Sequence, residues 1–316
     1  MTYHLLFTID VEDWFQVENF KQYIPFSSWS SHELRVEKNT HRLLNLLDSA
    51  SSHHLATRNS QPETRNPIYA TFFVLGWIAE RLPHLVKEIS SRGHEIASHG
   101  YYHHLCNDCS PDDLKKDLIK SKSLLEDIVG FPVYGYRAPS FSISDDTLKI
   151  IEDCGYLYDS SYNSFAIHGR YGQISPFQNG QKGIAYKIPR TPNSKLATRN
   201  AQLETFYELP ISNLRFAHQV FPWGGGGYFR LIPFPLFRLG VRSILKKENA
   251  YLFYMHPWEI DENQPRVDEA PVFYKFRHYI NLSKTHRKLS KLIESFAHCN
   301  FITCSQYLNE VMKSTL

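Results

Sequence analysis

Residues 70–103 read ATFFVLGWIAERLPHLVKEISSRGHEIASHGYYH, and this stretch contains the pattern that predicts the fold. Residues 70–75 form an apolar run with the length of a buried strand, and residues 78–91 have helical spacing before Gly93. A second apolar run over residues 94–98 follows and ends at His99. A strand, a helix and a second strand in this order predict two parallel strands joined by a crossover helix.

The same alternation continues on both sides of this stretch. Short apolar runs predict further strands at residues 5–9, 133–136, 156–158, 251–255 and 301–304. Helical spacing predicts helices at residues 39–48, 144–154 and 274–297, and another at 111–129 between a Ser110 cap and Gly130. Repeated alternation of strand and helix indicates an α/β fold with a parallel sheet, which either stays open or closes into a barrel.

Composition and charge exclude several classes of protein. The chain has 316 residues, with 35 Lys and Arg against 32 Asp and Glu, so its net charge is +3. This balance gives no reason to expect nucleic acid or an anionic membrane as partner. The N-terminus lacks the basic segment of a secretory signal, and no apolar run approaches the roughly 20 residues of a membrane helix. Because five cysteines cannot all pair, we expect a cytoplasmic protein with reduced thiols.

Two polar segments interrupt the alternation. The sequence ATRNSQPET at residues 56–64 recurs as ATRNAQLET at residues 197–205, but the flanking sequences do not match. A repeated structural unit would extend beyond nine residues. We therefore predict one domain over residues 1–316, with inserted surface loops near residues 53–67 and 190–205. A shared docking tag is the less favoured interpretation of the repeat.

The residues with the clearest chemistry are His99 and His103, which follow the strand at residues 94–98. Two imidazoles four residues apart point the same way on one turn or tight loop and can bind one divalent ion. Asp10, Glu12 and Asp13 end the first predicted strand and would meet them at the same edge of a parallel sheet. An Asp or Glu with two histidines is typical of a catalytic metal site. A pair of surface histidines on a Tyr-rich loop is the alternative.

Three more polar residues follow predicted strands. Arg137, in the sequence YRAP, is placed to keep a catalytic carboxylate ionised, and Asp159 and His256 end two further strands. Each has an ordinary structural interpretation, as a surface arginine, a helix cap and a core histidine. Their recurrence at successive strand ends favours an active site. Cys106, Cys109, Cys299 and Cys304 could form a four-thiolate zinc site, although we favour incidental thiols.

The sequence motifs around these residues resemble those of the polysaccharide deacetylases of the NodB-homology class, carbohydrate esterase family 4. The similarity is to the branch associated with exopolysaccharide and exosortase (PEP-CTERM) loci. Its marks here are DVEDWF at residues 10–15, TFFVLGW at 71–77, GHEIASHGYYHH at 93–104, YRAPSF at 136–141, GGGGYF at 224–229 and HPWEID at 256–261. The resemblance implies a distorted (β/α) barrel with about seven strands.

The resemblance also implies roles for single residues. Asp10 matches the catalytic base, His256 the general acid, Arg137 the arginine that orients the base, and Asp159 the acid that tunes the histidine. His99 and His103 match the metal-binding histidines. The family usually has two adjacent aspartates, but Val11 follows Asp10 here, so the acidic ligand is Glu12 or Asp13. Glu12 is slightly favoured because it lies two residues from Asp10, on the same strand face. The implied metal is one divalent ion, zinc first and cobalt second.

The implied reaction is hydrolysis of the acetamide of N-acetylhexosamine units in an exopolysaccharide or its lipid-linked precursor, which releases acetate. Candidate sugar-binding residues are Trp14, Tyr136, Pro139, Trp223, Gly226, Tyr228 and Trp258. The glycine run at residues 224–227 either lets the backbone approach a sugar or is a flexible loop. One alternative function is hydrolysis of another C–N bond, as in a cyclic imide or ureide, and a second is non-catalytic sugar binding.

The expected partner is an N-acetylated polysaccharide or oligosaccharide, and no nucleic acid is expected. Basic residues over 275–291 leave peripheral membrane contact open, although a solvated outer helix is the favoured interpretation. The sequence does not predict an oligomeric state.

Overall fold

The computed structural model describes residues 2–52, 67–165, 171–175, 183–188, 205–217 and 219–313. The predicted inserts near residues 53–67 and 190–205 fall almost wholly outside these residues. Within the described part of the chain, no helix is both long and apolar enough to cross a bilayer.

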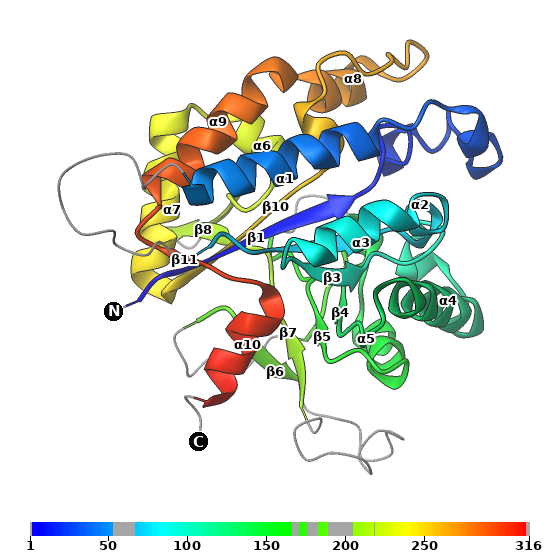
Figure 1. Ribbon diagram of the computed structural model, residues 1–316, viewed down its shortest axis with the longest axis horizontal. Coiled ribbons are helices and arrows are strands. Elements are labelled where there is room, and N and C mark those ends of the chain that lie inside the picture. Colours follow the sequence, from blue (N-terminus) through cyan, green and yellow to red (C-terminus); the bar gives the residue numbers. More distant parts are fainter. Residues whose placement is uncertain are drawn as a thin grey trace.

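A curled sheet, most of whose strands are parallel, forms the centre of the molecule (Figure 1). Its order is β10 (Ala250–Met255), β1 (His4–Val11), β2 (Ala70–Val74), β3 (Glu95–Ser98), β4 (Gly135–Tyr136), β5 (Tyr158–Asp159), β7 (Phe206–Glu208) and β6 (Tyr186–Ile188). The first seven of these strands are parallel, β6 is antiparallel to β7, and β11 (Asn300–Phe301) pairs with β1. The predicted α/β class and barrel-like sheet are confirmed.

Alternate side chains of β1 pack into two different hydrophobic cores. Leu5, Phe7 and Ile9 belong to the large core between the sheet and the outer helices. Leu6 belongs to a second core inside the curl, together with side chains of α10 (Cys304–Lys313). Because side chains alternate along a strand, Asp10 lies on the same face as Leu6 and projects into the curl. Both faces are buried, which explains why this strand is almost continuously apolar.

Helices cover the outer surface of the curl (Figure 1). These are α1 (Val36–Ser52), α2 (Gly76–Arg81), α3 (Pro83–Ser91), α4 (Pro111–Val129), α5 (Asp145–Asp153), α7 (Phe234–Glu248) and α9 (Leu282–Ser295). Helix α4 begins and ends as predicted, because the Ser110 hydroxyl accepts the Asp113 N–H and Gly130 adopts a left-handed conformation.

Two predicted helices are each divided in the structure. The helix predicted at 78–91 is α2 and α3, because Pro83 occupies the first turn of α3 and Leu82 is not helical. The helix predicted at 274–297 is α8 (Val272–Tyr279) and α9, which are separated at Asn281, where φ is 55°. Both predictions extended one helix through a residue whose backbone is not helical, because the apolar spacing continues on either side of it.

Elements between residues 206 and 248 were not predicted. They include β7, the hairpin of β8 (Asn213–Phe216) and β9 (Gln219–Pro222), α6 (Gly226–Leu231) and α7. The strands have only three or four residues, and α7 begins at PFP and contains Gly240, so neither pattern stands out.

A buried histidine links fold stability to pH. The His94 side chain is 4% exposed, and its Nδ1 accepts the N–H of Ala70 at 3.3 Å. Burial lowers the pKa of His94 to about 4, so the folded protein favours the neutral ring. The stability that this provides is complete above the unfolded pKa near 6.5 and is lost as the pH falls toward 4.

We predict that His94→Gln unfolds more easily than the native protein at pH 7, and that this difference shrinks by about 2 kcal/mol at pH 5. Glutamine keeps an acceptor for Ala70 but cannot become charged. Urea unfolding of both proteins at the two pH values measures the change. An equal difference at both pH values would contradict a neutral buried His94.

Candidate active site

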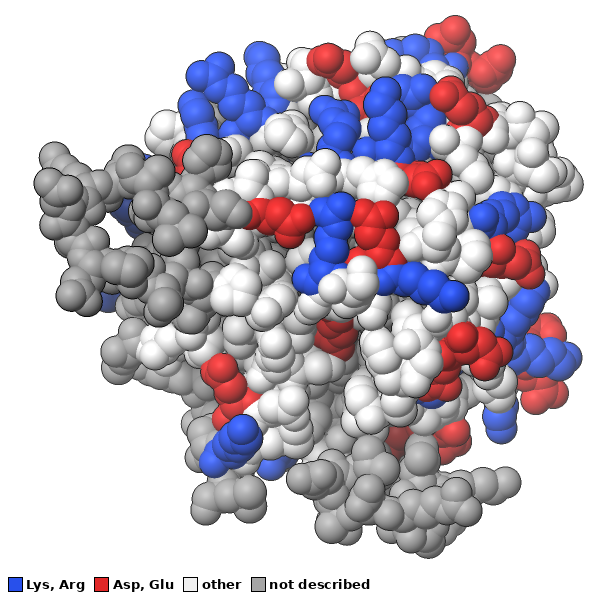
Figure 2. Space-filling model, in the orientation of Figure 1, with Lys and Arg blue, Asp and Glu red and all other residues white. Residues whose placement is uncertain are grey.

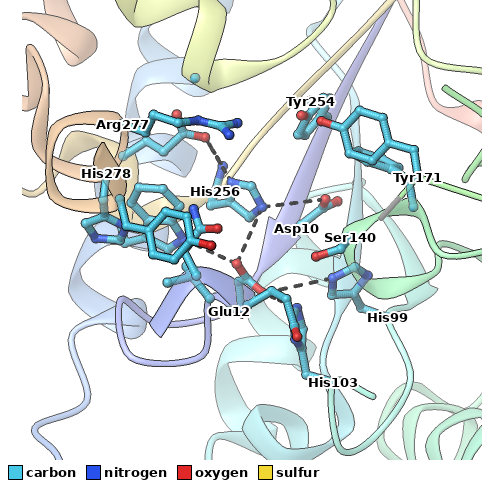
Figure 3. A pocket seen from close by; sticks show the side chains of 18 of the residues that line it. Asp10, Glu12, His99, His103, Ser140, Tyr171, Tyr254, His256, Arg277 and His278 are labelled. Atoms are coloured by element: carbon cyan, nitrogen blue, oxygen red, sulfur yellow. Dashed lines mark hydrogen bonds and ion pairs between the residues drawn. The ribbon is translucent and has the colours of Figure 1, made fainter. Parts of the chain in front are cut away.

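Polar side chains from separate strands meet at the carboxyl ends of the sheet (Figure 3). Asp10 lies at the end of β1, His99 directly follows β3, and His256 directly follows β10. Arg137 follows β4 in the same way. The sequence predicted this convergence from the rule that parallel strands share one functional edge.

Glu12, His99 and His103 converge closely enough to bind one metal ion. Their candidate ligand atoms all lie within 4.8 Å of one another, and all three residues are buried. The Nε2 of His103 is 2.6 Å from Oε2 of Glu12, and Nε2 of His99 is 4.0 Å from the same oxygen. Within the described residues, no other group of three or more such side chains converges in this way, so the four cysteines form no such cluster.

The loop that carries His103 is held in a tight conformation. The Asp117 carboxylate accepts the N–H groups of Tyr101 and Tyr102 at 2.9 and 3.1 Å. Gly100 has φ +72°, and a Cβ there would lie 2.8 Å from the Asp117 carboxylate. His103 itself has φ 56°. The two histidines therefore lie on a tight loop, one of the two conformations that their spacing allowed.

The protonation states of this group suit a divalent metal. Burial alone would raise the pKa of Glu12, but His103, His256 and His99 lower it to about 2, so the carboxylate is ionised. Burial lowers the pKa of His99 to about 4. The Nδ1 of His99 lies 2.9 Å from the carbonyl oxygen of Arg137, which leaves Nε2 to face Glu12. The ionised Glu12 carboxylate and the neutral, oriented imidazole of His99 fit a zinc site.

Asp13 points away from this group, although the sequence left it open as the acidic ligand. Its carboxylate accepts the N–H groups of Trp14, Arg35 and Val36 at 2.6–2.8 Å, just before α1 begins. The chain turns after Glu12, and Asp13 is used to hold the entry to the helix. Burial raises the pKa of Asp13 to about 6 despite these hydrogen bonds.

Asp10 is held by a fully buried arginine. Arg137 donates from one terminal nitrogen to Oδ1 of Asp10 at 2.7 Å and to the Thr8 hydroxyl at 2.8 Å. Its Nε and other terminal nitrogen donate to the carbonyl and hydroxyl oxygens of Ser160. The guanidinium also lies over the ring of Phe73, 4.0 Å from its centroid. Oδ1 of Asp10 is therefore fixed, and Oδ2 faces His256 at 3.9 Å.

His256 is held by a second buried ion pair that the sequence analysis missed. Its Nδ1 lies 2.9 Å from Oε1 of Glu259, and the Glu259 carboxylate accepts Nε–H of Arg230 at 2.8 Å. Burial alone would lower the pKa of His256, but Glu12, Glu259 and Asp10 raise it to about 9. His-x-x-Glu at a turn is capping-box spacing, and this signal would have identified Glu259.

Asp159, which the resemblance assigned to tune the histidine, lies elsewhere. Its carboxylate accepts the N–H and hydroxyl of Ser161, and the Ser161 hydroxyl accepts the N–H of Ala138. Burial beside Asp159 raises the pKa of Glu208 well above its usual range, so these two acids share a proton. The structure therefore places Glu259, and not Asp159, at His256. Asp159 instead supports the backbone next to Arg137.

A pocket of about 380 Å³ opens above these residues (Figure 3). Of the seven candidate sugar-binding residues only Trp258 lines it, and its indole N–H is donated to Glu12 at 3.3 Å. Trp14, Tyr136, Pro139 and Trp223 are buried outside the pocket, because their side chains fill the core. Tyr228 packs against Phe165, also outside the pocket lining. Aromatic residues that do line it and were not predicted are Phe141, Tyr171, Tyr254, Phe273 and Tyr274.

The glycines at residues 224–227 pack mainly against other atoms of the protein and not against an open cavity. A Cβ on Gly226 would lie 2.2 Å from the Glu259 carboxylate, and one on Gly225 would lie 2.7 Å from the Tyr254 ring. Gly224 accepts the N–H of Tyr254. The run therefore lets the backbone before α6 pack against β10 and Glu259. Gly227 is the member of the run that lines the pocket.

Two segments of the chain are similar to known protein families. Residues 64–158, which include both metal-site histidines and Arg137, match the family described as polysaccharide deacetylase. This segment of the chain is similar to polysaccharide deacetylases. Residues 160–309 match a family described only as a domain of unknown function, DUF3473. This second segment supplies His256, Glu259 and Arg230, so the candidate site draws on both matched segments and on β1.

Two curated relatives are similar to less than a third of the chain. A peptidoglycan-N-acetylglucosamine deacetylase of Bacillus cereus is 34% identical over 87 residues, 28% of this chain and 40% of that protein. The peptidoglycan deacetylase-like protein FGM2 of Gibberella zeae is 38% identical over 91 residues, 29% of this chain and 27% of that protein. The chain thus spans less than half the length of these relatives.

Two solved structures share the fold. A protein of Mycobacterium smegmatis, provisionally named a polysaccharide deacetylase, is 19% identical, with a TM-score of 0.60 over 100% of this chain and 92% of that chain. The allantoinase Puue is 14% identical, with a TM-score of 0.55 over 96% of this chain and 88% of that chain. At these identities the similarity establishes the fold alone.

We predict that Glu12→Gln weakens zinc binding by more than about 100-fold, because a metal ligand contributes more than its outer hydrogen-bond partners do. Asp13→Asn is the matched control. It should keep the affinity and lower the free energy of unfolding by about 1–3 kcal/mol, because it weakens the hydrogen bonds that hold the start of α1. Zinc titration calorimetry and urea unfolding separate the two effects. Loss of zinc affinity in Asp13→Asn alone would reverse the assignment.

Proposed function

We propose that this chain hydrolyses the acetamide of N-acetylhexosamine units in a polysaccharide, with a divalent metal held by Glu12, His99 and His103. The observation that carries the proposal is a carboxylate and an imidazole held side by side next to these ligands. Asp10 and His256 approach to 3.9 Å, and each is fixed by its own buried partner. Amide hydrolysis needs a base to activate water and an acid to protonate the departing nitrogen.

The comparisons support the substrate class. The matched family is that of polysaccharide deacetylases, and the two curated relatives bear the names of peptidoglycan deacetylases. We propose an exopolysaccharide or its lipid-linked precursor as the substrate on the resemblance of DVEDWF at residues 10–15 to that branch. We also propose that the chain acts as one catalytic domain, because one sheet takes strands from residues 4 to 301.

Each protein group has one role in the proposed reaction. Bound zinc or cobalt would polarise the acetamide carbonyl and acidify water. Asp10 accepts a proton from the water that attacks the carbonyl carbon, while Arg137 fixes the carboxylate. His256 then donates its Nε2 proton to the amide nitrogen. The C–N bond breaks with its electron pair on nitrogen, and the products are acetate and a free amino sugar.

Glu259 positions His256 for this donation. Its Oε1 lies 2.9 Å from Nδ1 of the ring and also accepts the backbone N–H of His256 at 3.0 Å. Burial alone would raise the pKa of Glu259, but Arg230 and His256 hold it below its usual range. An ionised Glu259 keeps a proton on Nδ1, so that the second ring nitrogen faces the pocket as the donor.

We predict that Glu259→Gln lowers kcat for an N-acetylated oligosaccharide by about 100-fold, within the range of general acid catalysis. It should leave hydrolysis of para-nitrophenyl acetate within about threefold of the native rate, because that leaving group needs no protonation. Asp159→Asn is the matched control, and it should not change the ratio of the two rates. An equal loss on both substrates in Glu259→Gln would mean that Glu259 is only structural.

The proposed function is tested by acetate release from N-acetylglucosamine oligomers by the purified chain, with chelator and with added zinc or cobalt. We predict metal-dependent release that falls by more than about 100-fold in Asp10→Asn and in His99→Ala. Asp112→Asn, at an exposed position in the first turn of α4, is the control for Asp10→Asn. Metal binding without acetate release, together with hydrolysis of allantoin, would instead assign the chain to ureide hydrolysis. Oligosaccharide binding without any hydrolysis would leave a sugar-binding protein.

A further inference from the structure

Two long segments of this chain contain no acidic residue. Residues 209–247 have six Lys and Arg and no Asp or Glu, and residues 270–293 have six more and again no acid. All 32 acids of the chain therefore lie in the remaining sequence, although the net charge of the whole is only +3. The near-neutral net charge of the whole chain therefore hides two strongly basic segments. The net charge alone did not reveal them.

The two segments form one side of the molecule, which we name the α6–α9 face after its four helices (Figure 1). Arg230 of α6 donates to the carbonyl oxygens of Arg277, His278 and Ile280 on and after α8. Lys288 of α9 donates to the carbonyl oxygens of Phe229 and Ile232. These hydrogen bonds join the helices across a separation of about fifty residues in the sequence.

Apolar side chains are exposed on the same helices. Six of the twelve exposed large apolar side chains of the described residues belong to α6, α7 and α8. They are Leu231 (40% exposed), Leu236 (53%), Leu239 (57%), Val272 (79%), Phe273 (61%) and Phe276 (52%). Exposed large apolar side chains concentrated on neighbouring helices are typical of a contact with a protein or a membrane.

The charges around these side chains are available to a partner. Arg242, Lys284 and Lys291 are exposed, and none of them forms an ion pair with an acid of the described residues. Figure 2 shows Lys and Arg side chains along the upper edge of the molecule, where Figure 1 places α9, with some Asp and Glu side chains among them. The acids that flank the two segments include Glu248, which ends α7 and pairs with Lys247 at 3.4 Å, Glu294 in the last turn of α9, and Asp268 and Glu269 before α8. The face therefore combines unpaired positive charge with apolar side chains.

We propose that the α6–α9 face docks on an anionic lipid bilayer. Lys and Arg side chains would be attracted to the anionic headgroups, and the exposed Leu, Val and Phe side chains would enter the boundary with the acyl chains. A nucleic acid would satisfy the charges but would leave the aliphatic side chains in water. A membrane satisfies both, and this decides between the two partners.

The docking face adjoins the catalytic pocket. Gly227 and Arg230 of α6 and Phe273, Tyr274 and Arg277 of α8 line the pocket. Docking would bring the mouth of the pocket to the lipid surface, where a saccharide attached to a lipid carrier would be within reach. This last consequence rests on the proposed function, whereas the docking itself does not.

The test is flotation of the full chain with lipid vesicles. Native protein should float with phosphatidylcholine vesicles that contain phosphatidylglycerol, less with phosphatidylcholine alone, and less again at high salt. Reversing two charges with Arg242→Glu and Lys284→Glu should lower binding by more than about tenfold. The apolar pairs Leu236→Ser with Leu239→Ser, and Val272→Ser with Phe276→Ser, should each lower it by about tenfold as well.

Matched control variants lie on α4 and just after it. Ile119→Ser with Phe131→Ser removes two apolar side chains of 45% and 46% exposure, and Lys115→Glu with Lys116→Glu reverses two exposed charges. Both should bind vesicles as the native protein does. Equal losses in the controls, or no flotation of native protein, would overturn the proposal. Binding to duplex DNA or heparin without vesicle binding would assign the face to a polyanion, which also overturns it.

The vesicle result does not depend on catalysis. Acetate release from soluble oligomers should be native in Leu236→Ser with Leu239→Ser, because neither residue lines the pocket. If neither the native protein nor its variants release acetate but flotation follows the predicted pattern, the proposed function is wrong and the docking proposal is supported. If acetate is released but flotation does not follow the predicted pattern, only the docking proposal is wrong.

Discussion

The interaction on which the site depends is the one between Arg137 and Asp10. The arginine side chain is 0% exposed, and its hydrogen bonds reach β1 through Thr8 and Asp10 and the end of β5 through Ser160. A guanidinium removed from water in this way is stable only with its charge balanced and its donors used. The same contacts that satisfy Arg137 fix the position of the proposed base. Folding of the sheet and placement of Asp10 are therefore one event.

Each of the three carboxylates in the site has its own positively charged or histidine partner. Arg137 holds Asp10, Arg230 holds Glu259, and Glu12 lies among three histidines. Each carboxylate has a different local partner, so the three acids keep different environments within one pocket. In the proposed reaction, this separation lets Asp10 act as the base, Glu12 bind the metal and Glu259 hold a protonated imidazole.

The sequence predicted the parts of this arrangement that follow from strand ends. Asp10, Glu12, His99, His103, Arg137 and His256 come together because parallel strands end at one edge. Side-chain direction after a strand was not predictable in the same way, so spacing alone could not choose between Glu12 and Asp13. The resemblance assigned Asp159 to His256, whereas the structure has Glu259 there. The aromatic candidates Trp14, Tyr136 and Trp223 fill the core, because an aromatic residue near a motif packs inward as readily as toward a ligand.

The fold was predictable to the same extent. Strands buried on both faces form apolar runs that are visible in the sequence, as in β1, β2 and β10. The three-residue β7 and the helix α7, which starts between prolines, have no such pattern. The breaks at Pro83 and Asn281 depend on backbone conformation, which hydrophobic spacing does not report.

The alternation of β1 sets a limit on how this chain can change in length. Thr8 and Asp10 share a face with Leu6, and Phe7, Ile9 and Val11 share the other. Insertion of one residue in the strand would exchange the two faces, turning the carboxylate toward the outer helices and Val11 toward Arg137. A connection between a strand and a helix has no such alternation of faces to preserve. An insertion or deletion within β1 would therefore displace Asp10 from Arg137, so the length of this strand is constrained.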